Sequence, residues 1–284
     1  RKRAVSALLL AFGLGTAAAD VNLQQLANGG VAIDDGVTRV IIDGLVVEPY
    51  AIYAGLPPEA VDDFEQAAGP FGGVDLALAS HRHHDHNQPA FACEFLQASE
   101  TTRLVTSAEV IGLMREKCRA FVTGSDRVVA IDPQPGAPVV LEEGDVRVTV
   151  FRLSHGKRKF ANIENFAHLV EAGGVRLLHI GDAAMDPVAF EQAGLGGLEV
   201  DVAFIPVWFF QPGPGEAVIE AFMDAPRKFA VQVPPDEAPA ARAYLDRPAV
   251  RQVLGREVAV LASGPFAAGR HAVTWSGRNA SGER

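Results

Sequence analysis

Basic residues are in the minority in this sequence, and cysteine is nearly absent from it. The chain of 284 residues carries 25 Lys and Arg against 35 Asp and Glu, so that its formal net charge is −10. Proteins that bind nucleic acid use Lys and Arg to replace the counterions of a phosphate backbone, and we therefore expect no nucleic-acid partner. The two cysteines, Cys93 and Cys118, are too few for a disulfide-dense scaffold or a four-cysteine zinc module.

Long apolar runs are missing as well. The mostly apolar residues 4–14 are fewer than the roughly 20 that a membrane span needs, and no other stretch is long enough. This run follows Arg1, Lys2 and Arg3 and precedes the small residues 17–19, which is the layout of a secretory signal peptide. We expect residues 1–19 to be removed on export, leaving a periplasmic or secreted protein without a stable membrane anchor. An uncleaved anchor is the alternative.

Residues 20–284 contain no run of Pro, Gly or Ser long enough for a linker, and we predict that they form a single domain. In an oxidising compartment, Cys93 and Cys118 would either form a disulfide or remain as two buried thiols. The sequence leaves both open because it does not give their Cα separation.

Segments with the patterns of strands and helices alternate along the chain, which predicts sheets covered by helices. The predicted strands are residues 31–34, 38–46, 74–79, 127–131, 139–141, 146–153, 165–171, 175–180, 200–205, 229–233, 258–261 and 272–275. The predicted helices are residues 58–68, 88–98, 107–117, 215–223 and 235–245.

The most informative motif directly follows the predicted strand 74–79. Residues 81–86 read His-Arg-His-His-Asp-His, four histidines and one aspartate within six positions. Neutral imidazole and carboxylate are the usual ligands of zinc and related divalent ions. On a turn after a strand, His81 and His83 can converge on one ion, while Asp85 and His86 face a second position. A solvated polar loop is the alternative.

The pattern His-x-His-x-Asp-His after a hydrophobic strand resembles the signature of the metallo-β-lactamase fold superfamily of hydrolases. Further pieces follow in the family's order: Ser154-His155-Gly156, the Gly-Asp motif ending at Asp182, and the strand-like residues 201–206. Residues 163–182 are most similar to the lactonase-like, Zn-dependent branch. The resemblance implies an α/β fold, an αββα sandwich of two mixed β-sheets flanked by helices, with metal at one sheet edge.

The resemblance also implies a ligand set. The first metal position would be held by His81, His83 and His155, and the second by Asp85 and His86, with Asp182 bridging the two. Where the family usually has one more histidine, on a loop after a late strand, this chain has none, and Gln232 is the nearest match. We expect one or two zinc ions, with iron and manganese also compatible with these ligands.

By the same resemblance the protein would be an exported metal-dependent hydrolase acting on a small-molecule ester, lactone, thioester or phosphoester. A water on the metal would supply hydroxide, and Asp85 would orient or deprotonate that water. Asp182 stands where thiolate-containing β-lactamases have a cysteine, which argues against β-lactams as the substrate. The absent histidine favours an alternative, a catalytically degraded metal- or ligand-binding protein on this scaffold. The sequence indicates neither the substrate nor the oligomeric state.

Three further residues are candidate substrate contacts. Trp208 and Phe209 enter a loop rich in Pro and Gly and would wall an apolar pocket, or they pack in the core. Lys157 lies in a basic turn close to His155 and would hold an anionic group, or it is part of a solvated hairpin tip.

Overall fold

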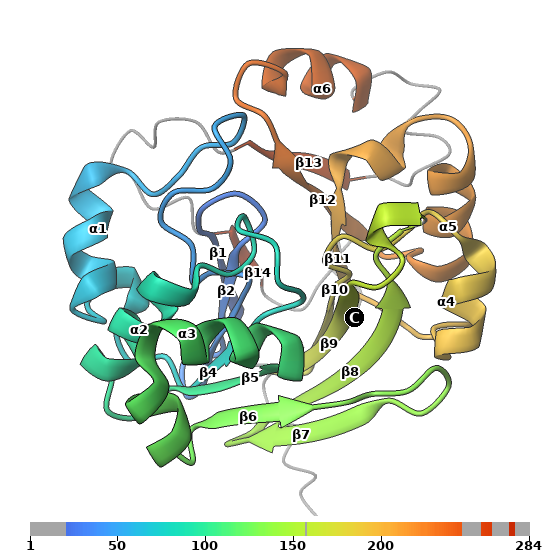
Figure 1. Cartoon of the computed structure of the whole chain (residues 1–284). Coiled ribbons are helices and arrows are strands. Elements are labelled where there is room, and N and C mark those ends of the chain that lie inside the picture. The colour runs from blue at the N-terminus through green and yellow to red at the C-terminus, as the bar shows by residue number, and fades with distance from the viewer. Residues whose placement is uncertain (1–20, 157, 246–256, 263–272, 276–284) are drawn as a thin grey trace, which may run out of the picture.

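Two seven-stranded mixed β-sheets face each other in this protein, and helices cover the outer face of each (Figure 1). The computed structural model describes residues 21–156, 158–245, 257–262 and 273–275. The expected signal peptide and Lys157 lie outside the described residues. The αββα sandwich predicted from the sequence is confirmed.

The first sheet has the strand order β14-β1-β2-β3-β4-β5-β6. It is antiparallel from β14 to β3 and parallel from β3 to β6. Its strands are β1 (Val21–Gln25), β2 (Val31–Asp34), β3 (Arg39–Ile42), β4 (Leu76–Leu78), β5 (Arg103–Ser107), β6 (Val128–Ile131) and β14 (Val273–Trp275). The intervening helices are α1 (Pro58–Glu65), η1 (Gly69–Phe71), α2 (Pro89–Ala98) and α3 (Ala108–Gly124).

The second sheet repeats this plan, with seven strands in sequence order from β7 to β13. It is antiparallel from β7 to β10 and parallel from β10 to β13. Its strands are β7 (Val139–Glu143), β8 (Val146–Ser154), β9 (Glu164–Ala172), β10 (Val175–His179), β11 (Val202–Pro206), β12 (Arg227–Val233) and β13 (Glu257–Ala262). Its helices are η2 (Arg158–Phe160), α4 (Pro187–Ala193), η3 (Val207–Phe210), α5 (Pro214–Phe222) and α6 (Ala238–Leu245).

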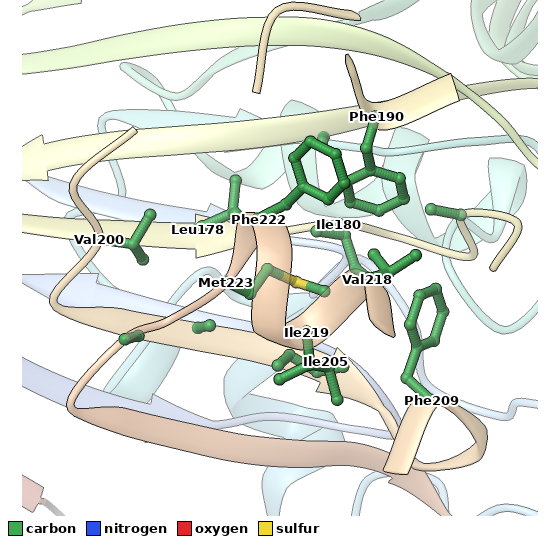
Figure 2. Packing of buried hydrophobic residues seen from close by; sticks show 14 of the residues in the cluster. Leu178, Ile180, Phe190, Val200, Ile205, Phe209, Val218, Ile219, Phe222 and Met223 are labelled. Carbon is green, nitrogen blue, oxygen red and sulfur yellow. The ribbon is translucent and has the colours of Figure 1, made fainter. Parts of the chain in front are cut away.

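Three apolar layers hold the sandwich together. Between the sheets, side chains such as Ile33 and Ile42 join Phe166 and Phe204 in one buried cluster. A second cluster packs α1, α2 and α3 on the first sheet. In the third, α5 lays Val218, Ile219 and Phe222 against Leu178, Ile180 and Ile205 of the second sheet (Figure 2). Strands covered on both faces need continuous apolar runs, which is why β4, β10 and β11 contain few polar residues.

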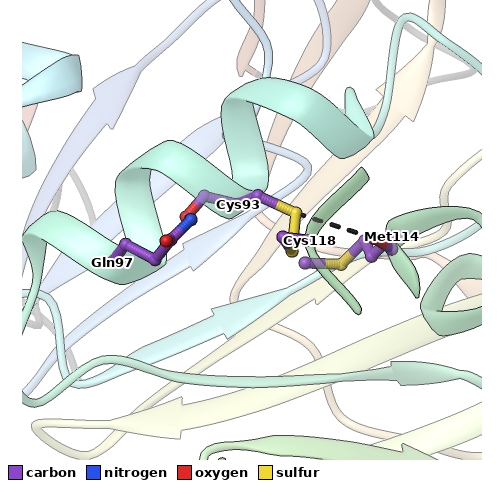
Figure 3. The surroundings of a disulfide bond; sticks show 4 residues. All are labelled: Cys93, Gln97, Met114 and Cys118. Atoms are coloured by element: carbon purple, nitrogen blue, oxygen red, sulfur yellow. Dashed lines mark hydrogen bonds between the residues drawn. A yellow bond between two sulfur atoms is a disulfide. The ribbon is translucent and has the colours of Figure 1, made fainter. Parts of the chain in front are cut away.

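A disulfide joins Cys93 of α2 to Cys118 of α3, with a Cα–Cα distance of 6.1 Å (Figure 3). The structure thus decides between the two alternatives that the sequence left open. The bond closes a loop with a sequence separation of 25, and a loop of this size stabilises a fold by about 3 kcal/mol in the chain-entropy model.

Several local predictions differ from the structure: strand β5 and helix α4 were not predicted, and two further differences have a visible cause. The strand expected at residues 38–46 ends at Ile42, because Asp43 adopts a left-handed φ of 50° and turns its carboxylate into the interior. Strand β1 was not predicted, since only pairing with β2 and β14 makes it a strand. Within the described part of the chain, every helix is too short or too polar to cross a membrane.

Candidate metal centre

The predicted ligands meet where strands of both sheets end. His81 and His83 follow β4, His155 follows β8, and Asp182 follows β10. Strands β8 and β10 both pair antiparallel with β9, so that their carboxyl ends lie at one edge of the second sheet. The facing edge of the first sheet brings the loop after β4 to the same place. Apolar strands therefore deliver polar side chains to one point.

Three imidazole nitrogens converge there. His83 Nδ1 lies 3.1 Å from His81 Nε2 and 3.0 Å from His155 Nε2. Asp182 Oδ2 lies 3.7 Å from the His81 nitrogen and 3.6 Å from the His155 nitrogen. Two ligands of one tetrahedral zinc at about 2.0–2.1 Å are themselves about 3.3 Å apart. The spacing of these four residues therefore fits a single ion, and we call His81, His83 and His155 the histidine half of the pocket.

The histidine half is prepared to bind a cation. The Ser80 hydroxyl donates to Asp43 Oδ2 at 2.6 Å, so the His81 Nδ1–H group, 3.0 Å from the same hydroxyl, donates to Ser80. His81 Nε2 is thereby left with a free lone pair. Burial lowers the pKa of His81, His83 and His155. Neutral imidazole is the form that binds metal.

A second group of polar side chains lies on the other side of Asp182. His86 Nε2 lies 3.0 Å from Asp182 Oδ1 and 3.8 Å from Asp85 Oδ2. Asp182 therefore presents one oxygen to each side. Gln232, 1% exposed, places its Nε2 3.0 Å from His86 Nε2 and donates it to Asp182 Oδ1. We call Asp85, His86 and Gln232 the amide half of the pocket.

Charge distinguishes the two halves. Burial alone would lower the pKa of His86, but Asp182 and Asp43 outweigh burial and raise that pKa well above its ordinary value. Burial raises the pKa of Asp85. Burial would also raise the pKa of Asp182, but His86 and the hydrogen bond from Gln232 hold it well below its usual range.

Two residues that support the pocket escaped the sequence analysis. Asp43 accepts hydrogen bonds from the Ser80 backbone at 2.7 Å and from His86 Nδ1 at 2.7 Å. Asn28 donates its Nδ2 to Asp85 Oδ2 at 3.2 Å. A charged residue directly after the apolar strand 39–42 was a signal for Asp43. Asn28 had no comparable signal, because this residue lies in the turn between β1 and β2 and β1 was not predicted.

The aromatic candidates divide into core and rim. Phe209 is fully buried and faces Phe190, with ring centroids 6.5 Å apart. Of the two alternatives for this residue, the structure therefore supports core packing rather than contact with a substrate. Trp208 is half-buried against the same core. Phe160, which the sequence analysis missed, stacks on His155 at 5.2 Å and meets the His83 ring edge-on at 5.9 Å.

A sandwich of two mixed sheets with histidines and an aspartate at the strand ends is the arrangement of the metallo-β-lactamase fold hydrolases. A family model described as the beta-lactamase superfamily domain matches residues 55–241, which is more than half of the 284 residues. The chain belongs to this superfamily, as its motifs predicted. No curated protein sequence matches the chain.

Several solved structures share the fold. Igni18, a metallo hydrolase from Ignicoccus hospitalis, aligns with a TM-score of 0.57 and 12% identity over 90% of this chain and 98% of that chain. The metallo-beta-lactamase fold protein YhfI from Bacillus subtilis aligns with a TM-score of 0.56 and 14% identity over 86% of this chain and 97% of that chain. CmlA, a diiron beta-hydroxylase from Streptomyces venezuelae, aligns with a TM-score of 0.54 and 17% identity over 84% of this chain and 52% of that chain. At these identities the likeness concerns the fold.

Proposed function

We propose that this protein is an exported metal-dependent hydrolase that cleaves an ester, lactone, thioester or phosphoester bond of a small molecule. The observation that carries the proposal is the convergence of His81 Nε2, His83 Nδ1 and His155 Nε2 beside Asp182 Oδ2. Three histidines and a carboxylate match the donors that zinc takes in hydrolases, and iron and manganese accept the same donors.

When bound, a divalent ion lowers the pKa of a water molecule and polarises the bond to be cleaved. The chain itself supplies a proton acceptor next to that position. Asp85 is buried and Asn28 holds its Oδ2, while its Oδ1 has no hydrogen-bond partner among the described residues. A carboxylate whose pKa is raised by burial is a stronger base, and it can take the proton from the attacking water.

Aromatic side chains support a reaction on a substrate with an apolar group. The Phe160 ring covers one side of His155 and His83. Tyr50 is 48% exposed and lies beside His84, with ring centroids 6.0 Å apart. Such rings exclude water from the reacting groups and contact an acyl or ring portion of the substrate.

The disulfide supports export. Bonds such as Cys93–Cys118 form and persist in the periplasm and outside the cell, and they are rare in the cytosol. Together with the basic and apolar residues 1–19, this favours a mature protein that begins at Asp20. N-terminal sequencing of the exported protein tests that start.

The substitution His83→Ala tests the hydrolase proposal. We expect bound zinc to fall from about one ion per chain to none, and turnover in a panel of esters, lactones, thioesters and phosphodiesters to fall at least ~10³-fold. His84→Ala is the matched control, because His84 lies next in the chain but contacts Gln88 at 2.9 Å. Full turnover by the His83→Ala protein on the substrate that the wild type prefers would refute the proposal.

Gln232 supports a second candidate, a metal- or ligand-binding protein without catalytic activity. The glutamine stands where the superfamily usually has a histidine, and a substitution in a catalytic site is how such scaffolds lose activity. One metal ion per chain with no turnover of any substrate class in the same panel would favour this candidate.

A further inference from the structure

The amide half of the pocket has the ligands of a second metal ion but not the space for it. His86 Nε2 and Asp182 Oδ1, 3.0 Å apart, are the two atoms that a second ion would have to join. The Gln232 amide nitrogen lies 3.0 Å from the first and is hydrogen-bonded to the second. An ion at about 2.0–2.2 Å from both ligands, on the side that Gln232 occupies, would meet this N–H group.

The amide nitrogen cannot itself be a ligand. Its lone pair is delocalised into the carbonyl, so it offers hydrogens and no electron pair. As placed, the Gln232 amide oxygen is buried without a hydrogen-bond partner among the described residues. Turning the amide over would offer this oxygen to His86, but it would also set two acceptors in contact at Asp182 Oδ1 with no proton between them. The orientation that hydrogen-bonds to Asp182 is therefore the one that excludes a cation.

The backbone holds the side chain in this place. Gln232 has a φ of 58°, in the left-handed region that residues other than glycine rarely adopt. The pairing of β12 with β13 shifts register between Ala230 and Val233, which marks an irregularity at this point of the strand. Behind the side chain, a Cβ added to Gly29 would lie 3.2 Å from Gln232 Cγ. Gly29 thus lets the backbone approach the Gln232 side chain more closely than a residue with a Cβ would.

We propose that the Gln232 carboxamide takes the place of a second metal ion, so that this chain holds one divalent ion, at His81, His83, His155 and Asp182. The presence of that first ion rests on the proposed function. With one ion bound, Asp85 is a free carboxylate held by Asn28 rather than a metal ligand. This chain then departs from the binuclear arrangement that its motif implies.

Metal stoichiometry tests this proposal without any measurement of turnover. Purified protein is stripped with a chelator, dialysed against a small excess of Zn²⁺ and analysed for zinc per chain, and a parallel titration follows Co²⁺ by its visible absorption. We expect one equivalent for the wild type. We expect two for Gln232→His, which adds an imidazole, and two for Gln232→Glu, which keeps the shape but replaces the N–H donors with a carboxylate.

Gln134→His is the matched control, because it adds a histidine at an exposed position, and we expect it to bind one ion. Circular dichroism and thermal unfolding identify the variants that fold. Two ions, or none, in the wild type would overturn the proposal whether or not the variants fold. So would a folded Gln232→His and a folded Gln232→Glu protein that both bind one ion. One ion without hydrolysis counts against the proposed function and leaves this inference intact.

Discussion

The two halves of the pocket use the same kinds of side chain to opposite effect. In the histidine half, His81 gives its Nδ1–H to Ser80 and turns its Nε2 toward another imidazole, 3.1 Å from His83 Nδ1. In the amide half, His86 lies between Asp43 and Asp182, within 2.7 Å and 3.0 Å. A neutral imidazole that faces other neutral imidazoles can give its lone pair to a metal, whereas the His86 ring, held between two carboxylates, favours its protonated form. Availability, rather than residue type, separates the halves.

The largest effects are expected when the variants His155→Ala and His86→Ala are compared, since each removes a histidine from one half of the pocket. Removing His155 should abolish zinc binding while costing the metal-free protein less stability, because its Nδ1 has no partner among the described residues and its Nε2 faces only the neutral His83 ring at hydrogen-bond distance. Removing His86 should leave one ion per chain, but it deprives the buried Asp43 and the partly buried Asp182 of their partner, which costs about 3–5 kcal/mol of unfolding free energy. Elemental analysis and urea unfolding in chelator measure the two effects.

The contrast between the two halves would be wrong if the His155→Ala and His86→Ala proteins both lost zinc, or if both lost the same amount of unfolding free energy. Gln66→Ala is a suitable control for the measurements, because Gln66 is exposed at the end of α1, in a different part of the fold. It should match the wild type in zinc content and in unfolding free energy.

A smaller effect is expected from Asp43→Asn, which acts on both halves at once. Asp43 accepts from Ser80, which orients His81, and from His86. An asparagine would set an N–H group against these donors. We expect zinc affinity to fall 10–100-fold, the usual range for a group that orients a metal ligand. Competition titration with a zinc-binding dye measures the change.

Asp34→Asn controls for the loss of a carboxylate near a strand end. Asp34 pairs with Arg39 in a partly exposed ion pair, and such pairs contribute about 0–1 kcal/mol. Zinc affinity should not change. Equal losses of affinity in the two variants would show that Asp43 acts through general stability rather than through its hydrogen bonds to Ser80 and His86.

The sequence predicted the histidine half better than it predicted the residues that prepare it. His81, His83, Asp85 and His86 lie within six positions, so their motif is visible without a structure. Asp43 and Asn28 act across 43 and 57 positions of chain; the place of Asp43 after an apolar strand marks it as unusual, but neither residue's neighbours show which partner it contacts.

The fold itself was predictable where the pattern is local. The alternation of apolar strands and helices predicted sheets covered by helices, and the resemblance to the metallo-β-lactamase superfamily implied that two such sheets form a sandwich. Strand β1 was missed because tertiary pairing, not propensity, makes Val21–Gln25 extended. The sequence left Phe209 open between a substrate contact and the core, because an aromatic run suits both, and the structure places it in the core.

The smallest expected effect is a pH dependence of the metal-free protein, and its sign differs between the halves. The pKa of His86 is raised in the fold, so its contribution to stability is complete below its unfolded pKa of about 6.5. That contribution is lost as the pH rises toward the folded value. The pKa of His81 is lowered by burial, so the unfolded chain takes up a proton first and stability falls as the pH drops below about 6.5.

Stability should therefore decline on both sides of pH 6.5, by at most about 1.4 kcal/mol per pH unit for each group. Urea unfolding in chelator at pH 5.5, 6.5 and 8.5 measures it. His86→Gln should remove the decline toward pH 8.5 and keep the decline toward pH 5.5, since the other histidines remain. NMR of the ring nitrogens should find His86 protonated at a pH where His81 is neutral. Identical titration of the two rings would mean that the halves do not differ in the way their hydrogen bonds imply.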